Sequence, residues 1–311
     1  MSYKKIHPIL YLLALVPPLM GAGNFVLAKG MTAEIGPFAL LFYRWFFALL
    51  FMTPIIAHGI KKDWKEIIKH RKYIFFTSLP AVVLFNTFSY LALRNTDSMN
   101  ASILTSTFPM FVIILEKIIF GDKFTSIKFV SVLLAMFGAI TIIMDGQYFI
   151  LTKLFSSWGD LLALAASFTW ATYAILLRKR PATINNRNFT WAMMVPGVVI
   201  ILPLYLIEEI YFIHTDITSL NFALTIFFLS FMVSIVGLLA WSFSVEKLGA
   251  LNASLFFYFA PVFTIILSII FLGEVLTSAR LIGLCFVLFG VTLPIISNVF
   301  KKKELESAEG L

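Results

Sequence analysis

The sequence predicts an all-α polytopic membrane protein with ten transmembrane helices in two inverted five-helix repeats. Three observations support this fold class: the chain of 311 residues is 60% hydrophobic and 13% charged, apolar stretches recur along it, and one long segment is nearly repeated in its second half. An ordinary soluble domain carries roughly a quarter charged residues, and a hydrocarbon core about 30 Å thick needs roughly 20 apolar residues per helix. The composition therefore excludes an ordinary water-soluble domain.

Ten apolar stretches have the length of a membrane-spanning helix. Helices are favoured because a lipid-exposed backbone must satisfy its hydrogen bonds within the segment, whereas barrel strands would alternate apolar and polar residues. A cleaved signal peptide is an alternative for the first stretch, but that stretch continues through NFVLAKG and has a counterpart later in the chain, so we retain it as a helix. The predicted spans are residues 8–28, 36–58, 73–94, 98–119, 126–145, 157–178, 189–207, 219–244, 250–271 and 277–299.

The basic residues predict the orientation of these helices. With the amino terminus inside, 19 of the 24 Lys and Arg residues fall on the inner side, among them those of the run KKDWKEIIKHRKY at residues 61–73. This is the positive-inside pattern, so we expect a multi-pass protein of the cell (inner) membrane with both termini cytoplasmic. The net charge of +8 then reports topology, and no nucleic-acid partner is expected. The 61–73 run fits either a short helix at the lipid headgroups or a solvated connector.

Two segments of the chain are nearly the same. MNASILTSTFPMFVIILEKIIFGD (Met99–Asp122) and LNASLFFYFAPVFTIILSIIFLGE (Leu251–Glu274) share 10 of 24 residues at an offset of 152. The chain is therefore divided into a first repeat (1–150), a second repeat (151–300) and a cytoplasmic tail (301–311). Because five is an odd number, the second copy enters the membrane from the opposite face, an arrangement that many transporters use for alternating access.

The ordered set GAGNFVLAKG, PFALLFYRWFFA, LALRNTDSMNASILTSTFPMF followed by GD, and LNASLFFYFAPVF followed by GE resembles the EamA-like branch of the drug/metabolite transporter superfamily. The resemblance spans essentially the whole chain, and its specificity lies in the order and duplication of the motifs. It implies ten transmembrane helices and transport of small metabolites, commonly the export of amino acids or related compounds.

Each of the two repeated helices carries a proline, Pro109 and Pro261. A proline inside a helix frees the carbonyl four residues earlier, here at Thr105 and Phe257. The pair fits two hinges facing a central cavity, with a simple packing kink as the alternative. At the start of the first helix, Asn100 and its neighbours are expected to cap the free amides.

Arg44 is the most unusual ionisable residue, because it lies about seven residues into the second span. Charges inside a membrane usually face the protein interior or water. Arg44 fits an anion partner, such as a substrate carboxylate, or a structural role in bonding helix carbonyls or a nearby acid. The family resemblance matches it to a recurrent arginine without settling its role.

Polar and aromatic residues near the middle of the spans are the candidates for a substrate cavity, since aromatics give broad apolar contact and amides bond amino or carboxyl groups. Replacement of Thr105, Ser106 and Thr107 by aromatics at 257–259 predicts one polar and one aromatic wall. The candidate substrate-binding residues are Asn24, Arg44, Asn86, Tyr90, Thr105, Ser106, Trp170, Tyr173, Trp241 and Tyr258.

Small residues recur with seven-residue spacing in the last helix of each half, at Ser131 and Gly138 and at Gly283 and Gly290. This spacing permits close helix contact, within one chain or between copies, so a homo-oligomer is one expectation. The other expected partners are a small-molecule substrate and membrane lipid.

The principal hypothesis is a secondary transporter of small metabolites working by alternating access, with amino-acid or related export as the first assignment. The alternatives are uptake or exchange of a nucleotide-like or S-adenosylmethionine-like metabolite and, from another class, an intramembrane enzyme. No HExxH, clustered His/Cys or Walker motif occurs, so we expect no metal site, no cofactor, no direct ATP drive and no enzymatic activity.

Overall fold

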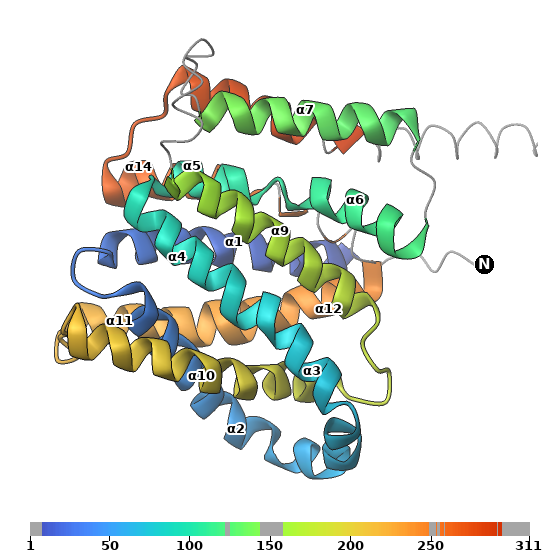
Figure 1. The fold of residues 1–311 in the computed structure, drawn as a ribbon, viewed down its shortest axis with the longest axis vertical. Coiled ribbons are helices and arrows are strands. Elements are labelled where there is room, and N and C mark those ends of the chain that lie inside the picture. Colours follow the sequence, from blue (N-terminus) through green and yellow to red (C-terminus); the bar gives the residue numbers. More distant parts are fainter. Residues whose placement is uncertain are drawn as a thin grey trace, which may run out of the picture.

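The computed structural model describes residues 8–121, 125–143, 158–248, 253, 256–257, 259–290 and 292–293. All regular secondary structure in these ranges is helical (Figure 1). The α-helices are α1 (Pro8–Met31), α2 (Pro37–Lys69), α3 (Arg71–Ser78), α4 (Phe85–Asn95), α5 (Ser98–Thr105), α6 (Phe108–Phe120), α7 (Ser126–Ile143), α9 (Trp158–Arg178), α10 (Asn186–Tyr211), α11 (Leu220–Phe227), α12 (Leu238–Leu248) and α14 (Phe259–Leu272). Two π-helices, η1 (Leu79–Leu84) and η2 (Phe228–Gly237), lie between α3 and α4 and between α11 and α12.

Seven helices of the described residues are long and apolar enough to cross a membrane, counting helices that continue through a π-helix or a short break as one. They are Leu12–Met31, Pro37–Lys69, Arg71–Asn95, Ser98–Phe120, Trp158–Arg178, Asn186–Tyr211 and Leu220–Leu248. Three shorter apolar helices are Phe129–Ile142, Phe259–Leu272 and Ser278–Gly290. The predicted all-helical class is confirmed, whereas the count of ten and the inverted arrangement stay predictions. The repeat boundary at 150–151 and the 301–311 tail lie outside the described residues.

The interior of the molecule is built around α1, α4, α9 and α12, which occupy the middle of Figure 1. α1 and α9 each contact both α4 and α12. At one end of the long axis α7 lies beside the Ser278–Gly290 helix, and at the other end lies α2. α2 has 33 residues and runs to Lys69. The 61–73 run is therefore neither a separate short helix nor a connector, because residues 61–69 continue α2 and residues 71–73 begin α3.

The predicted small residues pack α7 against the Ser278–Gly290 helix within one chain. A Cβ atom on Gly138 would lie 2.6 Å from the carbonyl oxygen of Gly283, and one on Gly283 would lie 2.9 Å from the carbonyl oxygen of Gly138. The Ser131 hydroxyl donates a hydrogen bond to the carbonyl of Gly290. Such contacts hold helices together where no hydrophobic force acts between them. A homo-oligomer stays a prediction.

Both repeat prolines lie in the first turn of a helix that follows a break. α5 ends at Thr105, and Pro109 is the second residue of α6. Pro261 is the third residue of α14, and the carbonyl of Phe257 accepts a hydrogen bond of 2.9 Å from the amide of Ala260. A proline at such a position costs no helical hydrogen bond, because the first amides of a helix have no intrahelical partner. Both prolines therefore begin helices, and a hinge role stays a prediction.

We expect Gly138→Ala to lower the melting temperature of the detergent-solubilised protein, because the added methyl group meets the backbone of the neighbouring helix. Overpacking of this kind costs about 1–3 kcal/mol. Met136→Ala is the control, since Met136 is an exposed residue of the same helix. A melting temperature that changes no more in Gly138→Ala than in the control would contradict the close packing of α7.

Candidate functional site

Arg44 of α2 is buried, with 5% of its surface exposed, and four neutral side chains surround its guanidinium group. Its Nε donates to Ser234 Oγ at 2.6 Å. Its Nη1 lies 2.9 Å from Asn24 Oδ1, 2.8 Å from Asn86 Oδ1 and 2.8 Å from the hydroxyl oxygen of Tyr90. The guanidinium carbon also lies 5.0 Å from the centre of the Trp45 ring. These residues come from α1, α2, α4 and η2, so four segments converge on one charge.

None of these partners of Arg44 carries a negative charge. Within the described parts of the chain, Arg44 forms no ion pair and its Nη2 donates no hydrogen bond. A buried ion costs several kcal/mol unless it is both paired and hydrogen-bonded. Among the described residues, Arg44 therefore has hydrogen-bond partners but no partner of opposite charge.

Two π-helices hold the partners of Arg44 in place. Asn86, just after η1, donates through Nδ2 to the carbonyls of Ala81 at 3.2 Å and Val82 at 2.9 Å, which turns its Oδ1 toward Arg44. Ser234, within η2, donates to the carbonyl of Leu229 at 2.9 Å while it accepts from Arg44. π-Helical turns are rare and occur frequently at functional sites. Residues 79–84 of η1 correspond to 231–236 of η2 at the 152-residue offset.

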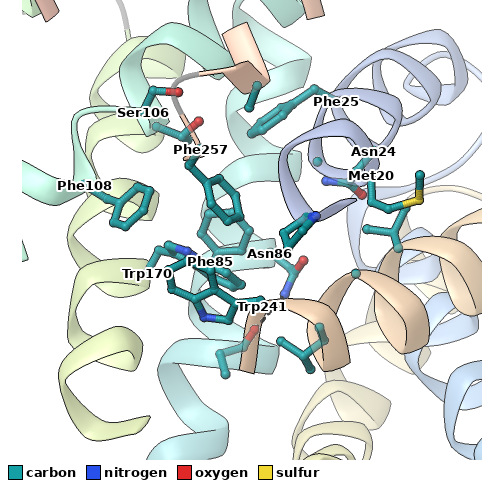
Figure 2. Close-up of a pocket in the computed structure, with 18 of the residues that line it drawn as sticks. Met20, Asn24, Phe25, Phe85, Asn86, Ser106, Phe108, Trp170, Trp241 and Phe257 are labelled. Carbon is teal, nitrogen blue, oxygen red and sulfur yellow. Dashed lines mark hydrogen bonds between the residues drawn. The ribbon is translucent and has the colours of Figure 1, made fainter. Parts of the chain in front are cut away.

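Arg44 lines a cavity of about 70 Å³, which has room for several water molecules. Aromatic rings form one side of it, whereas Asn24 and Asn86 lie toward α1 and α4 (Figure 2). The ring centres of Trp170 and Trp241 are 5.6 Å apart, and Phe257 packs edge-on against Trp241 at 5.0 Å. In the described structure, the indole nitrogens of Trp45, Trp170 and Trp241 are buried without a hydrogen-bond partner. The cavity thus combines one cation with a broad apolar surface, and three of its lining residues are tryptophans whose indole nitrogens have no partner among the described residues.

Seven of the ten predicted substrate-binding residues line this cavity: Asn24, Arg44, Asn86, Thr105, Ser106, Trp170 and Trp241. Tyr90 lies outside the lining but bonds Arg44 and Asn24. Tyr173 is fully buried, bonds Ser242 at 3.3 Å and packs against Trp170. Tyr258 lies outside the described residues.

The expected polar and aromatic walls are found only in part. Thr105, Ser106 and Phe257 line the cavity, but both hydroxyls donate to the carbonyl of Ser102. Thr107 instead bonds Ser167, and Phe259 is 48% exposed. Pro109 and Pro261 are adjacent to the lining residues Phe108 and Ala260 without lining the cavity themselves.

Sequence reasoning missed several residues of the site. Ser234 stands in an apolar run, and no local signal marks it as a partner of Arg44. Trp45, Phe85 and Phe108 line the cavity, but in a chain with 34 Phe and 6 Trp nothing separates them from packing residues. Trp45 follows Arg44 directly, which was the one available hint.

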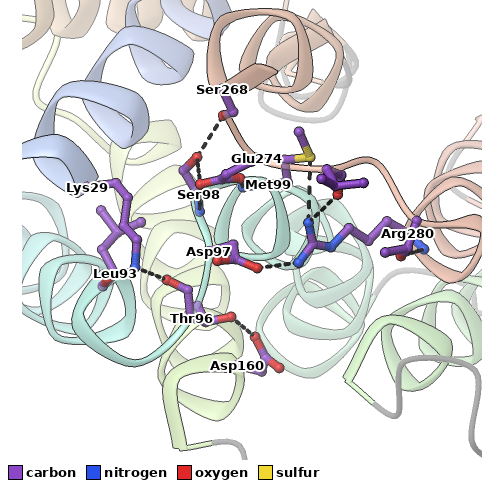
Figure 3. Close-up of polar contacts among 12 residues, drawn as sticks. Lys29, Leu93, Thr96, Asp97, Ser98, Met99, Asp160, Ser268, Glu274 and Arg280 are labelled. Carbon is purple, nitrogen blue, oxygen red and sulfur yellow. Dashed lines mark hydrogen bonds and ion pairs between the residues drawn. The ribbon is translucent and has the colours of Figure 1, made fainter. Parts of the chain in front are cut away.

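A second polar cluster lies around the start of α5 and the end of α14 (Figure 3). Glu274, just after α14, accepts hydrogen bonds from the amides of Ser98 at 2.9 Å and Met99 at 3.1 Å. Its Oε1 also accepts from the Ser98 hydroxyl at 2.6 Å. The carboxylate therefore caps α5, where negative charge is favoured by the free amides and the helix dipole. The expected cap by Asn100 is wrong, because α5 begins at Ser98, two residues earlier.

The same cluster joins further segments. Arg280 pairs with Asp97, and Lys29 donates to the carbonyls of Leu93 and Thr96, both at 2.8 Å. From this cluster toward the cavity, two hydroxyl pairs form a seam between α5 and α14. They are Ser98 with Ser268 at 2.7 Å and Ser102 with Thr264 at 2.9 Å. All four of these hydroxyl residues are buried. The seam leads from the polar cluster to Thr105 at the cavity.

Comparison with known proteins finds relatives along most of the chain. Residues 8–144 and 157–296 each match the EamA-like transporter family. The chain is 25% identical over 291 residues to the "Uncharacterized transporter YyaM" of Bacillus subtilis, covering 92% of this chain and 93% of the relative. It is 27% identical over 288 residues to an "Uncharacterized transporter" of Archaeoglobus fulgidus, covering 91% and 96%.

Two further comparisons concern function and fold. A "Probable amino-acid metabolite efflux pump" of Escherichia coli is 24% identical over 213 residues, covering 65% of this chain and 69% of the relative. A solved structure titled "Crystal structure of protein" has a TM-score of 0.63 and 16% identity, covering 94% of this chain and 98% of that one. That likeness shows a shared fold, and a shared fold does not by itself establish a shared function.

We expect Glu274→Gln to destabilise the protein, because glutamine removes the charge and one of the two oxygens that cap α5. Loss of a helix cap costs about 0.5–2 kcal/mol, which thermal unfolding in detergent will measure. Glu34→Gln is the matched control, since Glu34 is exposed in the connection between α1 and α2. Equal melting temperatures for the two variants would show that Glu274 does not stabilise α5.

Proposed function

The chain belongs to the EamA-like transporter family, and from this premise we propose that it is a secondary carrier of a small carboxylate-bearing metabolite, with an amino acid as the first assignment. The observation that carries the proposal is the buried Arg44, which lines the cavity without an opposite charge among the described residues. Arginine binds carboxylates strongly and with defined geometry. Family membership also favours a carrier over the alternative of an intramembrane enzyme.

The cavity supplies separate contacts for the parts of such a substrate. Arg44 Nη2 and the free indole N–H groups of Trp170 and Trp241 are donors for a carboxylate. The aromatic side formed with Phe108 and Phe257 suits an apolar body. We propose that Asn24, Asn86, Thr105 and Ser106 shape the polar side, and that Tyr90 and Tyr173 act behind the lining. We also propose Tyr258 as a substrate-binding residue, because it follows Phe257 in the second copy of the repeated segment.

We propose ten transmembrane helices in two inverted repeats. Seven long and three shorter apolar helices among the described residues support this count. Features recur at the 152-residue offset: the π-helices η1 and η2, the break before each proline, and the left-handed glycines Gly121 (φ 69°) and Gly273 (φ 64°). With five helices per half, equivalent helices cross in opposite directions, which is the basis of alternating access.

The ends of the bundle are candidates for the two gates. The cluster around Glu274 closes the end that the basic residues assign to the outside. At the opposite end, Arg178 lies 3.2 Å from Glu116, and Arg180 lies 2.8 Å from Glu246. We propose that these two sets of contacts form and break in turn, with Pro109 and Pro261 at the flexible breaks. Export is the first assignment of direction, supported by the amino-acid metabolite efflux relative.

Counterflow in liposomes tests the function directly. We expect purified protein to exchange one or more labelled amino acids in a saturable manner. The panel should include nucleotides, S-adenosylmethionine and organic cations, because uptake or exchange of an S-adenosylmethionine-like metabolite is the alternative. Saturable exchange of that compound alone would favour the alternative. Correctly folded protein that exchanges no member of the panel would contradict the carrier assignment.

Arg44→Gln tests recognition of the carboxylate. We expect competition by the carboxylate ligand to weaken by about 10- to 100-fold, since a hydrogen bond to a charged group contributes about 1.5–3 kcal/mol. Competition by the matching decarboxylated amine should change little. For the carboxylate ligand, Arg44→Lys should weaken competition less than Arg44→Gln does. Arg94→Gln is the control, because Arg94 is an exposed arginine. Equal losses for both ligands would reject carboxylate recognition by Arg44.

The proposed orientation places both termini, which lie outside the described residues, in the cytoplasm. We expect Glu34→Cys to react with a membrane-impermeant maleimide on intact cells and Lys65→Cys to react only after permeabilisation. Both positions are exposed, and Cys285→Ser removes the native thiol, which is also exposed. The reverse labelling pattern would place the termini outside.

A further inference from the structure

An apolar groove on the surface shares no lining residue with the Arg44 cavity and has no role in the proposed transport. The groove has a volume of about 470 Å³ and lies between the end of α2, the start of α3 and the first half of α10. Its lining residues are Trp64, Ile67, Ile68, Arg71, Lys72, Ile74, Phe75, Phe76, Trp191, Ala192, Val195 and Pro196. Two of the twelve are charged, and both are basic.

The walls of the groove expose large apolar side chains. Trp64 is 49% exposed, Phe75 is 41% exposed and Phe76 is 61% exposed. Exposed apolar patches of this kind mark an interaction with protein, ligand or membrane. The position of these side chains along the helix bundle indicates which of the three partners the groove contacts. α2 has 33 residues and is therefore about 50 Å long, whereas the hydrocarbon core is about 30 Å thick. The last turns of α2 thus extend to the level of the lipid headgroups, where tryptophan is enriched.

The charges at the groove are not neutralised by the protein. Asp63 Oδ2 accepts from the amide of Asn185 and the side chain of Asn188. Glu66 bonds Lys69 and Thr183. In the part of the chain that the structure describes, Arg71 and Lys72 pair with no acid. The nearby acids bond the connection before α10. The groove therefore keeps two positive charges without an acidic partner among the described residues, although Arg71 donates to the carbonyl of Ile68 at 3.2 Å.

We propose that this groove binds one anionic phospholipid, with an acyl chain against Phe75, Phe76 and Pro196 and the phosphate headgroup on Arg71 and Lys72. The combination of an apolar channel and adjacent unpaired cations matches both parts of that molecule. Basic pockets between membrane helices on the cytoplasmic side bind anionic headgroups, and each basic residue near the surface contributes to the attraction. A zwitterionic lipid satisfies only the apolar part.

The site also lies next to the machinery that positions Arg44. α3 runs directly into η1, and Ser78 at that junction donates to the carbonyl of Met193 on α10 at 2.7 Å. A lipid between α2, α3 and α10 therefore fills the space beside the helix that leads to Asn86. The lipid is expected to stabilise this part of the bundle against heat.

Native mass spectrometry of the full chain in detergent tests the proposal, with equal amounts of phosphatidylglycerol and phosphatidylcholine added. We expect the wild type to retain phosphatidylglycerol in preference to phosphatidylcholine. The double variant Arg71→Gln/Lys72→Gln should lose this preference by about fivefold or more, as two basic residues near an anionic headgroup predict. Lys61→Gln/Lys62→Gln removes the same charge from exposed positions of α2 outside the groove and should behave as the wild type.

Val195→Trp tests the apolar part, because it fills the groove and keeps every charge. We expect it to reduce the retained phosphatidylglycerol, and Phe76→Ala, at an exposed position, should do so with less risk to folding. Gel filtration checks that each variant is monodisperse. If Arg71→Gln/Lys72→Gln and Lys61→Gln/Lys62→Gln reduced the preference for phosphatidylglycerol equally, the proposal would be overturned. Such a result would indicate a general attraction of the lipid to the basic surface. Unchanged retention of phosphatidylglycerol in both apolar variants would show that the acyl chain does not lie in the groove. A dimer of the wild type that disappears in Val195→Trp would identify a second copy of the protein as the occupant.

Discussion

Arg44 keeps a positive charge within a bundle of apolar helices, where a buried ion costs several kcal/mol if it is uncompensated. The protein meets this demand with neutral oxygens from three other segments, at 2.6–2.9 Å. These bonds fix α1, α4 and η2 relative to α2, because the guanidinium is planar and its donors have set directions. The same bonds fix the shape of the cavity. Since none of the oxygens is charged, the opposite charge would come from the carboxylate of the proposed substrate.

Backbone groups impose a second demand, which acids from distant segments meet. The amides at the start of a helix have no intrahelical partner. Glu274 accepts from the first amides of α5, and Glu208 of α10 accepts from the amide of Ala39 in α2 at 2.8 Å. Gly36 leaves room for this contact, because a Cβ atom there would collide with the Glu208 carboxylate. Asp63 near the end of α2 accepts in turn from the amide of Asn185 at 2.9 Å, where α10 begins. Long-range caps thus join α2 to α10 at both ends.

The predictable part of the structure follows from composition and repetition. Apolar length predicts helices because the membrane allows few alternatives, and the isolated charge of Arg44 and the amides in apolar spans predict a polar site. Contacts that depend on backbone detail were not predictable. Nothing in the letters around Ser234 indicates a π-helix, and the cap on α5 comes from Glu274, 176 residues from Ser98. Local sequence favoured Asn100 because capping rules describe neighbours and cannot identify a distant carboxylate.

The seam between α5 and α14 suggests how a ligand in the cavity and a gate at the end of the bundle would be coupled in the proposed cycle. α5 has only eight residues, so it spans about 12 Å between Ser98, capped by Glu274, and Thr105 at the cavity. α14, with 14 residues, is about 21 Å long and runs from Ala260 at the cavity to the residues before Glu274. Their contact includes the Ser98–Ser268 and Ser102–Thr264 hydroxyl pairs, whose partners water can replace at little enthalpic cost. An apolar seam would resist wetting, whereas a seam of hydroxyl pairs would admit water if it opened in the proposed cycle. Because α5 is short and helical, displacement of Thr105 by a ligand would be transmitted to Ser98, so the cap and the cavity would change together.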